Sequence, residues 1–199
     1  MANTNKQYDD AVKTCEDIFI KKTKDYGTAW RVLRTISVVD QIFIKALRIR
    51  TIQGLKTQKV GDDIESEFKG IINYAVIGLI QLELQNPQVE DIAVEKVNKL
   101  YDNYIAFAKN TMMDKNHDYG EAWRDMSQES FADLILMKLM RIKQILANDG
   151  KTIISERNNY RRPSLRAISH HCRNIQFTLA AFTKKFQAFF PTRNHTLFS

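Results

Sequence analysis

The sequence repeats itself, and this repeat constrains the fold more than any other feature. Residues 24–31 read KDYGTAWR, and residues 117–124, 93 positions later, read HDYGEAWR. The register holds without a gap for about thirty residues, which indicates an internal duplication. Further identities at the same offset pair Lys22 with Lys115, Ser37 with Ser130, Asp40 with Asp133, Lys45 with Lys138, and Arg48 with Arg141.

The composition and the apolar spacing favour helices. The 199 residues include only seven Gly and three Pro, so few turn signals are present. Helical periodicity predicts helices over residues 8–24, 62–85 and 89–115, and S-x-x-D capping boxes at Ser37 and Ser130 predict two more helix starts. We therefore expect an all-α fold of about six to eight helices, built from a duplicated unit with a pseudo-twofold arrangement.

The repeat divides the chain into a first unit at residues 1–86, a second unit at 87–156 and an atypical tail at 157–199. After Glu156 the tail contains eight Lys and Arg residues and no acidic residue, whereas residues 1–156 are close to neutral. The overall charge of +7 therefore does not predict a polyanion-binding body, and nucleic acid is not an expected partner. The second unit is truncated, and its basic tail is expected to be poorly packed or the product of a frameshift.

The expected location is the cytoplasm. The two cysteines, Cys15 and Cys172, form no disulfide or zinc pattern. Neither a signal peptide nor a membrane-spanning run is visible, so we expect no membrane association. The sequence leaves open whether the chain forms a homo-oligomer.

Several motifs together resemble one known family. They are K-x-x-D-Y-G-x-x-W, the K-x-x-R helix that follows it, and the acidic helix leading into Asn73-Tyr74-Ala75. This combination, over roughly residues 10–156, resembles the nucleotide modification associated domain 1 family. The resemblance implies a small helical protein linked to nucleotide or modified-base metabolism, with no established reaction. A looser likeness is to the MazG-type pyrophosphohydrolases, whose paired E-x-x-E and E-x-x-D motifs this chain lacks.

Two acidic residues are candidate catalytic and metal-binding groups. Asp63 and Glu67 have i, i+4 spacing on a predicted helix, and carboxylates placed in this way can hold Mg²⁺ together with ligand phosphates. The alternative is that acidic residues in a first helical turn complement the helix dipole. Glu67 lies further from the helix start and is less well explained by that alternative.

Basic residues of both copies are candidate phosphate-binding groups. Lys45 and Arg48 have i, i+3 spacing, and Lys138 and Arg141 repeat them. Such cations suit a phosphate, with Arg31 as a further contributor. The alternative is a solvated helix face whose ion pairs contribute little.

The D-Y-G motifs have structural and functional interpretations. Asp25 and Asp118 are expected to accept backbone N–H bonds in a turn, and Gly27 and Gly120 to end a helix. The aromatic residues are expected in the core or an interface rather than stacked on a base; they are Tyr26, Trp30, Tyr119 and Trp123. Asn73, on an apolar face, either bonds between helices or contacts a ligand.

These residues support two hypotheses. The first is a nucleotide-binding or nucleotide-processing protein, in which Mg²⁺ would assist any phosphate-bond hydrolysis. The second is a non-catalytic helical scaffold or interaction protein. Because copy two lacks the acidic turn, at most one complete site is expected per chain. Glu67 is expected to be exposed, so that its replacement by Gln should barely change the melting temperature.

Overall fold

The computed structural model describes residues 2–61, 63–85 and 91–148. These ranges contain five α-helices, two short 3₁₀ helices and no β-strand, which confirms the predicted all-α class. The predicted tail at 157–199 and the predicted boundary between residues 86 and 87 lie outside the described residues. In chain order the helices are α1 (Ala2–Tyr26), η1 (Ala29–Val32), α2 (Thr35–Leu55), α3 (Ile64–Leu84), α4 (Val94–Tyr119), η2 (Ala122–Asp125) and α5 (Gln128–Ala147).

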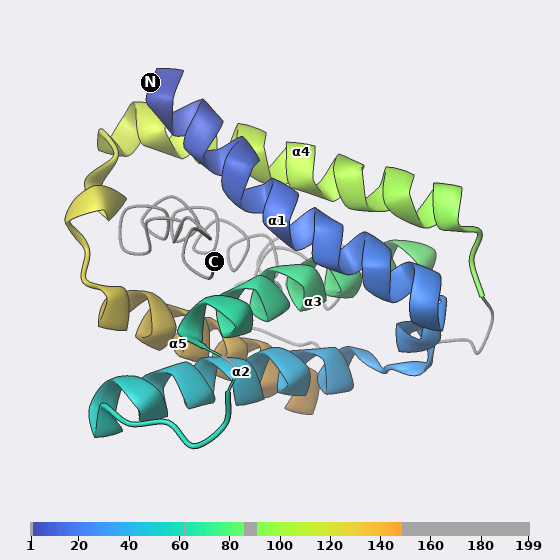
Figure 1. Ribbon diagram of the computed structural model, residues 1–199, viewed down its shortest axis with the longest axis horizontal. Helices are drawn as coiled ribbons and strands as arrows, with labels where there is room; N and C mark the ends of the chain where they lie inside the picture. The colour runs from blue at the N-terminus through green and yellow to red at the C-terminus, as the bar shows by residue number, and fades with distance from the viewer. Residues whose placement is uncertain (1, 62, 86–90, 149–199) are drawn as a thin grey trace, which may run out of the picture.

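Helix α3 is the centre of the fold. Figure 1 shows α1 and α4 along one side of the molecule and α2 and α5 along the other, with α3 between them. Helix α3 contacts α1, α2 and α4, and α2 also contacts α5. Its apolar side chains are therefore buried over a broad face, and Ile71, Val76 and Ile80 have no exposed surface. Within the described ranges, no helix combines the length and apolarity that crossing a membrane requires.

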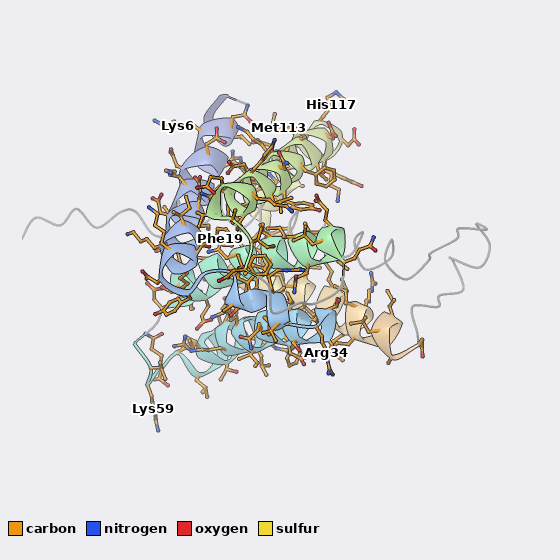
Figure 2. The ribbon with its side chains drawn as sticks, turned by 90° about the vertical axis from the view of Figure 1, so that its right-hand side faces the viewer. Lys6, Phe19, Arg34, Lys59, Met113 and His117 are labelled. Carbon is orange, nitrogen blue, oxygen red and sulfur yellow. The ribbon has the colours of Figure 1, made fainter. Side chains whose placement is uncertain are left out.

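The core reaches from α3 to both outer pairs of helices. Phe19 of α1 lies in the interior, where its ring stacks on Tyr101 of α4 at a centroid distance of 4.4 Å. Figure 2 labels Phe19 near the middle of the molecule, and Lys59 and His117 at its periphery. His117 has a side chain that is 83% exposed, which agrees with an ordinary surface residue.

The predicted capping boxes are wrong, because both helices begin earlier. Helix α2 starts at Thr35 and places Ser37 inside its first turn. Helix α5 starts at Gln128, where the Ser127 side chain accepts a hydrogen bond from the Ser130 backbone N–H. Extended backbone separates each helix from the preceding 3₁₀ helix, at Leu33 and Arg34 before α2 and at Met126 and Ser127 before α5.

The duplication is visible in which residues are buried. Position by position, at an offset of 93, buried residues of α2 correspond to buried residues of α5: Val38 and Phe131, Val39 and Ala132, Ile42 and Ile135, Ala46 and Leu139, Ile49 and Ile142. The same holds for α1 and α4: Tyr8 and Tyr101, Cys15 and Ala108, Phe19 and Met112, Thr23 and Asn116. The two copies therefore turn equivalent faces towards the core.

Two ion pairs join α2 and α5, and in the second pair the acidic and basic residues come from the opposite helices to those of the first. Asp40 pairs with Lys143 at 2.6 Å, and Asp133 pairs with Arg50 at 3.6 Å. Asp40 corresponds to Asp133 in the repeat, and Arg50 corresponds to Lys143. A twofold relation between the units requires such an exchange. The pseudo-twofold arrangement of the complete units stays a prediction.

Candidate functional site

A cavity of about 440 Å³ lies among α1, η1, α2 and α3, beside the D-Y-G motif of the first copy. The motif contributes Lys22, Tyr26, Gly27 and Trp30 to its wall, and α2 contributes Lys45. The first turns of α3 complete the lining. Four segments that the sequence analysis singled out separately therefore meet around one space.

Glu67 is the buried centre of an ion-pair network on one wall of this cavity. Its carboxylate accepts a hydrogen bond from Lys45 Nζ at 3.0 Å and another from Arg48 Nη1. The Glu67 side chain is only 7% exposed, so the expectation of an exposed carboxylate is wrong. Gly70 lies one turn further along α3, where an added Cβ would lie 2.9 Å from Lys45 Cε. The small residue thus lets the Lys45 stem cross α3 to reach Glu67.

Asp63 has a structural partner of its own. It is the N-cap of α3, and its Oδ1 accepts the Ser66 backbone N–H at 2.7 Å. Glu67 is engaged by two cations and Asp63 by a backbone N–H, so both carboxylates already have partners within the fold. In the described part of the chain, no group of three or more metal-ligating side chains occurs. The Mg²⁺ site stays a prediction.

The cavity is lined by more positive than negative charge. Lys22, Lys45 and Lys69 face a single carboxylate, that of Glu67. Lys69 also pairs with Glu65, and Lys45 with Glu67. Lys22 is exposed and makes no ion pair with any described residue. The lining therefore favours an anionic ligand.

Aromatic side chains also line the cavity. Trp30 and Tyr74 are half-buried and pack against the core, whereas Tyr26 is 72% exposed. Its counterpart Tyr119 is 70% exposed. Of the two predicted alternatives, core or interface, the core does not hold for either tyrosine, and the interface stays a prediction. Trp123, at 6% exposed, belongs to the core. Each D-Y-G tyrosine is the last residue of its helix, Tyr26 of α1 and Tyr119 of α4.

The D-Y-G turn beside the cavity is held by a residue from a distant segment. Asp91 Oδ1 accepts the Thr28 backbone N–H at 2.8 Å and the Thr28 hydroxyl at 3.0 Å. The Thr28 hydroxyl oxygen accepts the Ile92 backbone N–H at 3.0 Å. The Thr28 backbone hydrogen bond lowers the pKa of Asp91. The role predicted for Asp25 therefore belongs to Asp91, and Asp25 is exposed without a partner among the described residues.

The two motif glycines offer a matched test of this turn. Both have positive φ, at 59° for Gly27 and 60° for Gly120, as the sequence predicted. A Cβ at Gly27 would meet Asp91 Oδ1 at 2.6 Å, whereas nothing lies within 4 Å of a Cβ at Gly120. We expect Gly27→Ala to lower the free energy of unfolding by about 2 kcal/mol and Gly120→Ala by about 1 kcal/mol. Urea denaturation of both variants measures the difference, and equal losses would contradict a contact between the turn and Asp91.

Arg31 and Asn73 hold the helices around the cavity together. Arg31 is buried outside the cavity lining and donates to Gln81 Oε1 on α3. The Gln81 amide donates to backbone carbonyls of η1 and its C-cap, including that of Arg31 at 3.0 Å. Asn73 donates to the Cys15 carbonyl of α1 at 3.0 Å and accepts from Tyr101 of α4 at 2.9 Å. Asn73 is thus an inter-helix hydrogen-bonding residue that also lines the cavity.

The second copy gathers basic residues at the equivalent place. Burial lowers the pKa of Lys138, and the neighbouring charges of Lys115 and Arg141 lower it further. Neither Lys138 nor Arg141 lines the cavity of the first copy. Asp118 is exposed beside His117, and its carboxylate holds no backbone N–H of the turn among the described residues. The position equivalent to Glu67 is Tyr160, outside the described residues.

A comparison with known families matches two segments of the chain, and the first of them contains most of this cavity. The model described as nucleotide modification associated domain 1 matches residues 22–82 and 115–161, which together make up more than half of the chain. The chain belongs to the nucleotide modification associated domain 1 family. Its two matched segments begin 93 positions apart, at the offset of the repeat. No curated protein and no solved structure matches the chain.

The first family segment contains nearly the whole cavity lining. Of the lining residues, only Ile18 and Phe19 precede residue 22. The family segment therefore supplies the cations and the aromatic side chains of the wall. Three lining residues were not predicted as site residues: Lys22, Lys69 and Tyr74. For Lys22 a signal was present, because Lys115 repeats it, whereas Lys69 and Tyr74 lie in α3, which has no aligned repeat.

Proposed function

We propose that the first repeat unit of this protein binds a nucleotide in the cavity beside its D-Y-G turn. The observation that carries the proposal is the lining itself, in which three lysines and three exposed or half-buried aromatic residues surround one space. Lysines suit the phosphate as point charges, and Tyr26, Trp30 and Tyr74 offer aromatic surface to a base. A volume of about 440 Å³ falls within the range typical of small-molecule pockets.

The family supports the same class of ligand at a coarser level, through its association with nucleotide modification. If the nucleotide is also hydrolysed, magnesium would be the expected metal ion, and it commonly reaches such sites together with the phosphates of its ligand. Both carboxylates predicted to bind the metal have partners within the protein, since Asp63 caps α3 and Glu67 accepts hydrogen bonds from Lys45 and Arg48. We therefore propose recognition of the nucleotide as the function, with the phosphate bound by lysines.

Isothermal titration calorimetry of the full chain tests this proposal. The ribo- and deoxyribonucleoside monophosphates are titrated one at a time, followed by the triphosphates with and without Mg²⁺. We expect saturable binding of at least one nucleotide, and weaker binding of inorganic phosphate because phosphate lacks a base. Absence of binding for every nucleotide would contradict the proposal. Release of phosphate or pyrophosphate in the same samples would extend the function to catalysis.

A helical scaffold is the second candidate function. The observation that favours it is the structural use of Arg31, Asn73 and Asp63, which connect helices or cap α3. If the protein is a scaffold, substitutions of cavity residues should have no effect on nucleotide binding. A scaffold also predicts that binding partners are proteins, so a negative calorimetric screen would favour it.

A further inference from the structure

The basic pair on α5 lacks, among the described residues, the acidic partner that its counterpart on α2 has. In the first copy, Lys45 Nζ and Arg48 Nη1 donate to different oxygens of the Glu67 carboxylate. Lys138 and Arg141 occupy the equivalent positions on α5. Neither of them forms an ion pair with a described residue. The two copies therefore differ in how the same pair of cations is balanced.

The packing of α2 and α5 places the two basic pairs alike. Buried residues on either side of each pair correspond at the 93-residue offset, Ile42 with Ile135 and Ile49 with Ile142. Because both pairs have i, i+3 spacing, the cations of α5 follow the same flank of the buried face as those of α2. On α2 that flank brings an ammonium and a guanidinium to one oxyanion. The pair on α5 is therefore placed to share an oxyanion in the same way.

Lys138 lies in a positively charged environment that solvent can reach. Burial lowers the pKa of Lys138, and the charges of Lys115 and Arg141 lower it further. Lys138 is half-buried, whereas Arg141 is exposed. The residue equivalent to Glu67 is the neutral Tyr160. An anion from solution would therefore interact with both cations without competition from a described carboxylate.

Phosphate suits this pair of cations better than a carboxylate does. A guanidinium binds phosphate oxygens through its planar fork, and an ammonium adds a point charge. A phosphate dianion also balances both positive charges, whereas the single charge of a carboxylate balances one of them. We propose that Lys138 and Arg141 form an anion-binding site of the second unit, which takes a phosphate group where the first unit has the Glu67 carboxylate. Neither residue lines the cavity of the first unit, so this site is independent of the proposed function.

Equilibrium dialysis of the full chain against radiolabelled inorganic phosphate tests the proposal. We expect binding that Lys138→Met and Arg141→Met each weaken by about tenfold, the effect of losing one charge-assisted hydrogen bond. Lys143→Met is the control, because Lys143 lies on the same helix, has the same charge and pairs with Asp40 instead. Absence of phosphate binding by the wild-type chain, or an equal loss in Lys143→Met, would overturn the proposal.

Lys22→Glu separates this site from the cavity of the first unit. We expect it to leave the phosphate binding that depends on Lys138 unchanged, because Lys22 lines the other site. Loss of all phosphate binding in Lys22→Glu would overturn the proposal, since the phosphate would then belong to the first cavity. A chain that binds phosphate through Lys138 but binds no nucleotide would support this site and contradict the proposed function.

Thermal unfolding in chloride gives a second readout, with opposite signs for the two copies. Lys45→Met removes a partner of the buried Glu67 and should lower the melting temperature by about 4 °C. Lys138→Met removes a half-buried charge that has no ion-pair partner among the described residues, and should raise the melting temperature by about 2 °C. Similar losses in both variants would show that Lys138 has a structural partner, and would overturn the proposal.

Competition in the same dialysis identifies the source of the phosphate group. A nucleoside monophosphate that displaces labelled phosphate at similar concentrations would support a site for a phosphate ester. Failure of every monophosphate to displace it would support a site for free phosphate. Displacement by acetate at the same concentration as inorganic phosphate would overturn the assignment of a phosphate group.

Discussion

Replacing Glu67 with alanine is expected to lower the free energy of unfolding by about 3 kcal/mol. The carboxylate is 7% exposed, while Lys45 and Arg48, which it joins, are 28% and 23% exposed. Removal of the carboxylate leaves two largely buried cations next to each other. Their repulsion and their lost hydrogen bonds account for the cost. Chemical denaturation, followed by circular dichroism, measures it.

Glu65→Gln is the matched control for this prediction. Glu65 lies on the same helix two residues earlier, and its carboxylate also pairs with a lysine, Lys69. Its side chain is 26% exposed, so its ion pair is more screened and should contribute less than about 1 kcal/mol. Replacing Lys45 in addition to Glu67 should recover part of the loss, because one uncompensated charge is removed. Equal losses for Glu65→Gln and Glu67→Ala would contradict the importance of burial.

Reversal of charge at Lys22 is expected to weaken nucleotide affinity by about a hundredfold. Lys22 lines the cavity, is exposed, and makes no ion pair with a described residue. Lys22→Glu would therefore remove the proposed phosphate contact and add repulsion, while breaking no ion pair with a described residue. We expect the melting temperature to stay within about 2 °C of wild type, because exposed charges contribute little to stability. Calorimetry and thermal unfolding of the same sample measure both quantities.

Lys21→Glu separates this local effect from the change in net charge. Lys21 is the neighbouring residue, is also exposed, and does not line the cavity. The two variants have the same formal charge, so a long-range electrostatic effect would weaken binding in both. A hundredfold loss in Lys22→Glu with little change in Lys21→Glu supports a direct phosphate contact. Similar losses would show that the charge of the whole unit, rather than Lys22, controls affinity.

The fold was largely predictable from the repeat and from helical periodicity. The 93-residue offset identified which positions are equivalent, and the burial of α2 and α5 follows that correspondence from Val38 to Ile49. Gly27 and Gly120 were predictable for a local reason, since only glycine adopts positive φ without strain. Helix starts were less predictable, because a polar side chain such as Asp40 suits a capping box and an ion pair equally well.

The candidate site was predicted in part. Lys45 and Glu67, which were predicted to share a site, line one cavity, and Tyr26 and Trp30, which were expected in the core or an interface, line it as well. Their burial and their ion-pair partners were not predictable, because spacing along one helix does not reveal which residues of a neighbouring helix lie opposite. Glu67 is buried because α3 crosses α2 at the positions of Lys45 and Arg48. Arg31 is turned away from the cavity by Gln81, a residue 50 positions away.

The sequence by itself determined the duplication, the helical class and the family, because periodicity, glycine positions and repeated motifs are local properties of the chain. Only the tertiary structure decided which motif residues line the cavity and which hold helices together. Asp91 replaces Asp25 in the D-Y-G turn, and Asn116 pairs with the indole of Trp123. The physical reason is that hydrogen bonds and ion pairs form between segments that are distant in the chain, and their partners are set by packing.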